Sequence, residues 1–293
     1  MPAVQTKPSP APTAQSGMVL IAVLWIVAAL SIIVTGLTRS VRQEARLLAQ
    51  SRASVVAQAQ GDAALQLVLQ DLAARPAAPN RLSYVDATYR DVPVRVEVMP
   101  LNGLIDINNA PEALLTRLYT IAAGLPPAAA QALAQATVQA RERKDAKGVA
   151  ERFEAVEDLL RVPGIGYPLY ARLAPLVTAD LRGAGKVNPM AAPPEVLVVL
   201  AAGRADVAAR IADARLAGQD GIDSTGLDAA LIDNNTSGRR LRLRARVPLD
   251  SGAFLYVTRY VELTSRGRNG LPWYTYHTEL SYEPLPSTQS TQR

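Results

Sequence analysis

An uninterrupted run of about 20 uncharged, mostly apolar residues, 18–37, lies near the beginning of the chain. As a helix rising about 1.5 Å per residue, it covers the roughly 30 Å of a membrane's hydrocarbon layer. A cleavable secretory signal has a shorter apolar stretch and a small-x-small cleavage site, and neither fits this run. The pattern therefore predicts a transmembrane helix at residues 18–37, preceded by a polar leader at residues 1–17.

Apolar residues continue beyond this run at steps of three and four, from Val41 to Leu67, and Pro76 and Pro79 end the pattern. Such steps place the apolar residues on one face of a helix. We therefore expect an amphipathic stalk helix at residues 38–75 that continues the membrane helix and packs its apolar face on another element.

Alternation of apolar and polar residues, which is typical of strands, marks two separate stretches of the chain, 84–108 and 235–285. The residues between them, 109–234, instead show helical spacing with prolines at helix starts. The sequence therefore predicts an α+β fold, in which an antiparallel sheet is interrupted by a large inserted all-α domain. The polar residues 286–293 are expected to form a disordered tail.

The charge of the chain is mildly basic and spread along its length. The formal net charge is +5, and the 31 lysines and arginines are scattered. Residues 239–246 come closest to a basic stripe, but arginines alternate there with apolar residues and so fill one face of a strand. We expect a polar outer strand face and no nucleic-acid partner, because nucleic acid requires a clustered basic surface. The absence of cysteine excludes disulfides and thiolate chemistry.

Signals of catalysis are weak. The patterns GxSxG, HExxH and GxxxxGK[ST] do not occur, and His277 is the only histidine, in a strand-like stretch where a lone histidine is more often structural than a base. A loop rich in aspartate lacks the spacing of an EF-hand, which favours a solvated loop over a Ca²⁺ site; its acids are Asp220, Asp223, Asp228 and Asp233. We expect no catalytic residues, no metal ligands and no cofactor, with Ca²⁺ left as the one alternative.

A short segment that contains Pro163, Gly164 and Gly166 resembles the hairpin of helix-hairpin-helix modules. Its glycines permit a tight turn, and in DNA-binding modules of this kind the backbone N–H groups of the hairpin meet a phosphate. The same turn also serves simply to pack two short helices. The packing interpretation is favoured, because no lysine-rich stripe accompanies the hairpin.

Two segments, which begin at Asn108 and Asn188, share an order of asparagine, proline, glutamate and aliphatic residues. Each predicts a helix start in which the asparagine caps, the proline occupies the first turn and the glutamate lies at the positive end of the helix dipole. The two segments therefore look like copies of one unit that serves folding rather than ligand binding.

Four segments, taken in order along the chain, resemble the K-type minor pseudopilins of type II secretion systems (GspK family, general secretion pathway protein K). They are VLWIVAALSIIVTGLTRSVRQEARL, LNGLIDINNAPEALL, LLRVPGIGYPLYARLAPLVT and KVNPMAAPPEVL. The resemblance implies a long N-terminal transmembrane and amphipathic helix packed on an antiparallel pseudopilin sheet, with a large inserted all-α domain that contains helix-hairpin-helix-like motifs. It also implies a role in assembly rather than catalysis, at the pseudopilus tip, where related proteins help to start the pseudopilus for export of folded proteins across the outer membrane.

The same resemblance assigns roles to residues of the first helix. It makes Gly17 the last leader residue and Met18 the first mature residue after cleavage by prepilin peptidase. Ala22 stands at the fifth mature position, where most pseudopilins carry a glutamate. A carboxylate in lipid costs about 2.5 to 3.5 kcal/mol unless it is paired, so its absence suits a subunit with no neighbour above it. Helix packing against partners is expected from the apolar residues Leu20, Val23, Leu24, Val27, Val41, Ala45 and Leu48.

The partners implied by the resemblance are the I-type and J-type minor pseudopilins, with the H-type in addition, prepilin peptidase, the inner-membrane secretion platform and membrane lipid. It implies a single-pass protein of the bacterial inner membrane with its body in the periplasm. The positive-inside rule indicates the opposite orientation, because Arg39, Arg42 and Arg46 follow the apolar run. The family's acidic loop is reduced here to residues 141–148, and no Ca²⁺ site is carried over.

Two other classes of function stay open from the sequence. One is a membrane-anchored helix-hairpin-helix protein that binds DNA, for which salt-dependent DNA binding is the distinguishing observation. The other is an anchored hydrolase, which rests only on His277 and scattered acidic residues.

Overall fold

The chain divides into two compact units, residues 1–55 and 56–293. Most of the predicted leader and the whole of the predicted tail, 286–293, lie outside the described residues. Within the first helix, the side chains of residues 16–19, 32–42, 45 and 46 are likewise outside the description. The computed structural model describes residues 16–144, 147–219, 221, 223–234, 238–265 and 270–283.

Helix α1, Ser16–Ala74, is 59 residues long and includes both the predicted membrane segment and the predicted stalk. The segment is rich in alanine and leucine, which favour helix, and no proline interrupts it before Pro76. Several side chains of the predicted membrane segment, including those of residues 32–37, lie outside the described part of the chain. Among the residues that are described, no helix is long and apolar enough to cross a membrane.

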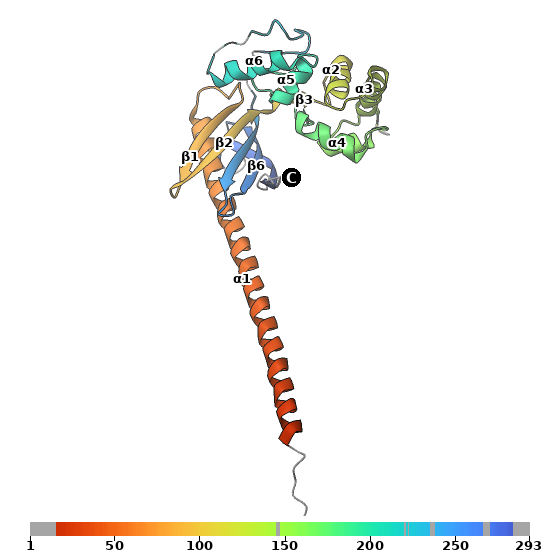
Figure 1. Ribbon diagram of the computed structural model, residues 1–293. Helices are drawn as coiled ribbons and strands as arrows, with labels where there is room; N and C mark the ends of the chain where they lie inside the picture. Colours follow the sequence, from red (N-terminus) through yellow and green to blue (C-terminus); the bar gives the residue numbers. More distant parts are fainter. Residues whose placement is uncertain are drawn as a thin grey trace, which may run out of the picture. The chain divides into compact units, whose positions relative to one another are not determined.

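Five strands form one antiparallel sheet in the order β1-β2-β5-β6-β7 (Figure 1). The turn between β1 and β2 consists of Arg90 and Asp91, both with positive φ, as the tight turns of hairpins require. β5, β6 and β7 follow one another as a meander. The strands are β1 Ser83–Tyr89, β2 Val92–Pro100, β5 Arg240–Pro248, β6 Phe254–Leu263 and β7 Trp273–Glu283.

The inner face of this sheet packs on the C-terminal part of α1. Leu65 and Leu69 of the helix and Leu243 of β5 are almost fully buried in one cluster, and each such side chain contributes about 1.5 to 3 kcal/mol by leaving water. Gly61 permits the close approach of helix and sheet, because a Cβ atom there would lie 2.6 Å from the Val257 Cγ2 atom. The apolar face of α1 and the inward-facing apolar residues of the strands therefore form one core.

The residues between β2 and β5 form a helical insert with a hydrophobic core of its own (Figure 1). Two very short strands, β3 and β4, pair in parallel within it. Its elements are η1 Leu101–Gly103, β3 Ile105–Asp106, α2 Glu112–Ile121, α3 Pro127–Glu142, η2 Val156–Arg161, α4 Tyr167–Leu173, η3 Ala174–Leu176, β4 Val177–Thr178, α5 Pro194–Leu200 and α6 Ala205–Leu216. The chain is thus a mixed α+β fold, as the sequence predicts at this level.

Residues 101–108 correct one detail of the sequence-based prediction, which assigned them to the main sheet. The chain leaves the sheet after Pro100 through the η1 turn, and β3 then pairs with β4 in a separate small sheet. Gly103 lies so close to the backbone of Ala191 that a Cβ atom there would be 2.3 Å from its carbonyl carbon. Packing of this turn against a distant segment, which local alternation cannot reveal, redirects the chain.

The insert covers part of the outer face of the main sheet. Leu82 and Met99, which border or belong to the first two strands, are buried in the insert's core rather than in the core under α1. Tyr260 of β6 and Tyr276 of β7 pack against the same core. The rest of the outer face carries polar and aromatic side chains.

Candidate interaction surfaces

The residues predicted to pack against partners lie on α1, and those with described side chains are exposed. Leu20, Val23, Leu24, Val27 and Leu48 are between 51% and 72% exposed. This exposure leaves their apolar surfaces available in the isolated chain.

The remaining predicted residues of α1 are described only in part. Ala22 is exposed, whereas the side chains of Val41 and Ala45 lie outside the described residues. Gly17 and Met18 belong to the helical backbone of α1, but their side chains are also outside the description. The proposed cleavage position therefore stays a prediction.

The C-terminal part of α1 separates its apolar residues into buried and exposed ones. Ala64, Leu65 and Val68 are buried against the sheet, whereas Val56 and Leu67 are nearly half exposed. The period of the apolar residues predicts one apolar face, but it does not distinguish residues under the sheet from residues beside it.

The predicted hairpin joins η2 to α4 and is anchored by packing. Gly164 has a φ of +97°, a conformation that favours glycine, and a Cβ atom there would lie 3.3 Å from the Leu133 Cδ1 atom of α3. Pro163 and Gly166 are exposed, while Ile165 between them is buried. These contacts agree with the interpretation in which the turn packs short helices.

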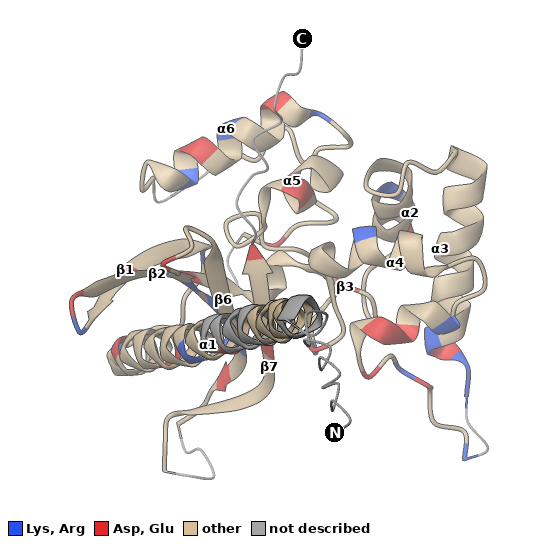
Figure 2. Cartoon of the chain, turned by 60° about the horizontal axis from the view of Figure 1, so that its bottom comes forward, with Lys and Arg blue, Asp and Glu red and all other residues tan. Residues whose placement is uncertain are grey.

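The charged side chains near the hairpin give no support to phosphate binding. Arg161, two residues before Pro163 in the sequence, pairs with Asp158 at 3.1 Å. Figure 2 shows acidic and basic positions interspersed along α6 and around the end of α3 rather than separated. The structure therefore favours a packing role for the hairpin over phosphate binding.

Asn108 and Asn188 do not cap helices, and this part of the sequence-based prediction is wrong. The N-caps of α2 and α5 are Pro111 and Pro193, without a side-chain cap. The Asn108 Nδ2 atom donates to the carbonyl oxygens of Phe153 and Ala179, at 2.9 and 3.1 Å. Its Oδ1 atom accepts the Phe153 backbone N–H at 2.9 Å. A buried amide that joins distant backbone segments takes the place of the expected cap.

Asn188 plays a similar part in the second copy. It is fully buried, its Nδ2 atom donates to the Asn80 carbonyl oxygen at 2.7 Å, and its Oδ1 atom accepts the Met190 N–H at 3.0 Å. Its backbone N–H donates to the Asn102 carbonyl oxygen at 2.8 Å. The asparagine thus ties the second copy to the segments on either side of the first strands.

A matching pair of arginines extends the likeness between the two copies beyond the residues that the sequence pattern singles out. Arg141 near the end of α3 donates to the Ala110 carbonyl oxygen at 2.8 Å. Arg215 near the end of α6 donates to the Ala192 carbonyl oxygen at 2.6 Å. Both acceptors directly precede an N-cap proline, and burial lowers the pKa of both guanidinium groups. These residues hold the insert together rather than form a binding site.

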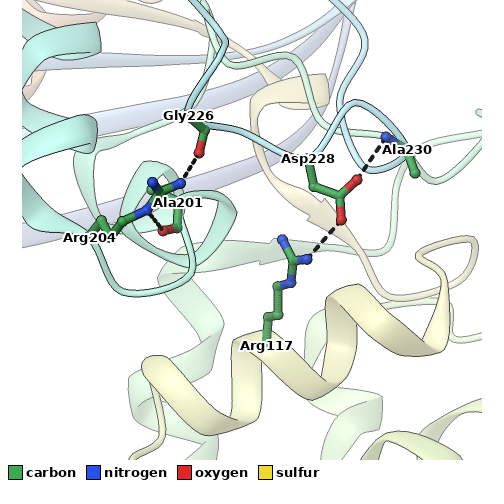
Figure 3. A network of polar contacts seen from close by, with 6 residues as sticks. All are labelled: Arg117, Ala201, Arg204, Gly226, Asp228 and Ala230. Atoms are coloured by element: carbon green, nitrogen blue, oxygen red, sulfur yellow. Dashed lines mark hydrogen bonds and ion pairs between the residues drawn. The ribbon is translucent and has the colours of Figure 1, made fainter.

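Much of the aspartate-rich loop is exposed, as a solvated loop would be, but one of its acids ties it to α2. The Asp228 carboxylate pairs with Arg117 of α2 at 2.7 Å and accepts the Ala230 N–H at 3.1 Å (Figure 3). Nearby, Arg204 donates to the carbonyl oxygens of Ala201 and Gly226 (Figure 3).

The described acids of this loop other than Asp228 show no arrangement of ligands for a cation. Asp223 accepts the backbone N–H and the hydroxyl of Thr225, and the hydroxyl lowers the pKa of its carboxyl group. Asp220 lies outside the described residues. Across the described part of the chain, no group of three or more His, Cys, Asp and Glu side chains is placed to hold a metal ion.

His277 lies on the exposed strand β7, where its Nε2 atom is 3.0 Å from a Glu279 carboxylate oxygen and its ring is 5.2 Å from the ring of Tyr260. Behind it, burial raises the pKa values of Asp180 and Tyr276. Arg240 pairs with Glu262 at 3.0 Å and donates to the Asp180 carbonyl oxygen. Through its bond to Asp180, Arg240 joins β5 to the insert, so these charged side chains have a structural role.

The expectation of a polar outer face on the arginine-rich strand is confirmed. Along β5, the leucines and alanine are buried under α1, while the arginines lie on the opposite face and are partly or fully exposed. Arg242 pairs with Glu97 of β2 at 3.0 Å. The guanidinium group of Arg244 stacks on the ring of Tyr256 at 3.8 Å. Alternation predicts the face, but the stacking partner on β6 follows only from the register of the sheet.

Among known proteins, the chain resembles a solved structure but matches no family model. Neither a family model nor a curated protein matches the chain. Among solved structures, the chain is similar to one in the crystal structure of the GspK-GspI-GspJ complex from the type 2 secretion system of enterotoxigenic Escherichia coli, with 15% identity and a TM-score of 0.45. The likeness covers 83% of this chain and 99% of that one.

Proposed function

We propose that this chain is a structural subunit that assembles with partners through helix α1. The observation that carries the proposal is the division of α1 itself. Its C-terminal apolar residues, such as Leu65 and Leu69, are buried against the sheet. Its earlier described apolar residues, such as Leu24 and Leu48, are exposed.

Exposed apolar side chains at this density call for a covering partner. Leu20, Ile21, Val23 and Leu24, nearly consecutive, are each more than half exposed. Soluble monomers rarely expose contiguous apolar patches larger than a few hundred Å². Covering a leucine-sized side chain with lipid or with another helix contributes about 1.5 to 3 kcal/mol, so even a few of these residues drive association.

Within this role, the ordered motifs of the sequence favour a K-type minor pseudopilin of a type II secretion system. In that role the chain is cut between Gly17 and Met18 by prepilin peptidase and anchored in the bacterial inner membrane, with its body in the periplasm. It joins I-type and J-type minor pseudopilins, and the H-type in addition, at the pseudopilus tip and helps to start assembly on the secretion platform. Ala22 in place of a glutamate suits a subunit at the end of the filament, because an unpaired carboxylate in lipid is unfavourable.

Co-purification tests the role in assembly. The full chain, expressed with I-type and J-type pseudopilins and extracted in mild detergent, is expected to be recovered as a complex. The substitution Leu48→Glu is expected to reduce recovery about tenfold or more, because it places a charge where an apolar side chain is covered.

Gln50→Glu is the matched control, since Gln50 is also exposed on α1 and the substitution adds the same charge. It is expected to leave recovery of the complex unchanged. Absence of a complex with the unaltered chain, or equal recovery for both variants, contradicts assembly through this face of α1.

A further inference from the structure

A cleft separates the insert from the open part of the outer sheet face, on elements distinct from the exposed face of α1. It has a volume of about 650 Å³. Tyr84, Arg242 and Arg244 contribute to it from the sheet, and Arg172 and Glu195 contribute from the insert. This volume falls in the range of roughly 300 to 1,000 Å³ that is usual for ligand sites.

The charges in the cleft do not balance. Glu97 also lines it but is already paired with Arg242, and both side chains are about four-fifths buried. Among the residues that the structure describes, Arg172 and Arg244 have no carboxylate within ion-pair distance. Among the described residues of the lining, Glu195 is the one other acid. Three arginines against two glutamates leave the lining with one excess positive charge, and neither Arg172 nor Arg244 is in an ion pair with a described residue.

The unpaired arginines are held in fixed orientations. Arg244 stacks on Tyr256, with the guanidinium carbon 3.8 Å from the ring centroid, and stacking leaves the N–H groups at the edge of the guanidinium plane free to donate. One nitrogen of Arg172 donates to the Ala123 carbonyl oxygen at 3.2 Å. The Nε atom of Arg242 is buried and has no acceptor. Donors that are oriented in advance lose little rotational freedom when an acceptor arrives.

The remaining lining is apolar. Ile121, Pro175 and Val198 contribute to the wall on the side of the insert, and Tyr84 on the opposite side is 51% exposed. An occupant must therefore offer both acceptors for guanidinium groups and apolar side chains. Carboxylates match the planar fork of arginine with two parallel hydrogen bonds.

We propose that this cleft binds an extended segment of a partner protein that carries alternating acidic and apolar side chains. Complementary charge selects the acidic residues, which meet Arg172 and Arg244, and the apolar wall accepts the residues between them. A nucleic-acid strand is a poorer match, because Glu97 and Glu195 also face the cleft and a phosphate backbone requires an unbroken row of cations.

Fluorescence anisotropy with the full chain in detergent tests the proposal. The probe is a fluorescein-labelled peptide of alternating glutamate and valine, and the reference probe replaces glutamate with lysine. Binding of the acidic probe is expected, with Kd in the micromolar range, and binding of the lysine probe is not. Arg172→Gln and Arg244→Gln are each expected to weaken binding about tenfold, as loss of a charge-assisted pair does.

Two further variants separate binding from folding. Arg210→Gln removes the same charge from an exposed position on α6 outside the cleft, and it is expected to change Kd less than twofold. Glu195→Gln removes a repelling carboxylate from an exposed position in the cleft, and it is expected to tighten binding several-fold. Equal Kd values for the Arg244→Gln and Arg210→Gln variants overturn the proposal. So does a single-stranded DNA probe that binds more tightly than the acidic peptide and responds to the same substitutions.

Discussion

Replacing Asn108 with alanine removes three hydrogen bonds that join the start of α2 to two other segments of the insert. The Phe153 N–H and carbonyl oxygen each lose a buried partner at 2.9 Å, and the Ala179 carbonyl oxygen loses a partly buried one at 3.1 Å. A buried polar group left without a partner costs about 1 to 3 kcal/mol, whereas water can reach a partly buried carbonyl. The two groups of Phe153 therefore set the expected loss of unfolding free energy at about 3 kcal/mol.

Urea unfolding of the full chain in detergent, followed by hydrogen exchange in the insert, measures this loss. Gln135→Ala is the control, because it removes an exposed amide side chain from α3 of the same insert; its expected loss is below about 1 kcal/mol. Losses of the same size for the two variants, or a loss below about 1 kcal/mol for Asn108→Ala, would refute the reasoning that Asn108 ties the insert together.

Two other substitutions test the cores and the buried charge. Gly61→Leu is expected to lower the unfolding free energy by about 3 kcal/mol, since even a Cβ atom would lie 2.6 Å from the Val257 Cγ2 atom. Gln66→Leu, on the exposed side of α1, serves as the control. An equal effect of the two substitutions would contradict close packing at Gly61. Burial raises the pKa of Asp106 above its unfolded value, so its ionisation lowers stability as the pH rises from about 4 through the raised pKa. The difference in unfolding free energy between the native chain and Asp106→Asn should therefore fall over this range and be level above it, and a difference that rises with pH would reverse the assigned direction.

Local patterns account for much of the secondary structure. The apolar period and the absence of proline predict a long helix close to α1, and Pro111 and Pro127 stand at or beside the first residues of α2 and α3. The alternation in residues 239–246 predicts the arginine face of β5. These features depend on residues within a few positions of one another, and such short-range preferences are encoded in the sequence itself.

The prediction that Asn108 caps a helix was wrong because it considered only neighbouring residues. Asparagine before a proline favours a cap locally, but its partners Phe153 and Ala179 lie far along the chain. The same holds for the turn at Gly103, which leaves the sheet to meet Ala191. Local propensity has no information about which distant backbone groups need a donor.

The exposed apolar face of α1 and the helical content of the insert are properties of the sequence, because period and proline position express them without reference to other segments. The choice between a buried and an exposed apolar residue on α1, such as Leu65 and Leu67, came only from docking on the sheet. The cleft is likewise a product of tertiary structure, since Arg172 and Arg244 belong to separate elements that only packing of the insert on the sheet brings together. Alternation in the sequence places an arginine on one face of a strand. How strongly its guanidinium group interacts there depends on which aromatic rings and carboxylates the fold brings beside it.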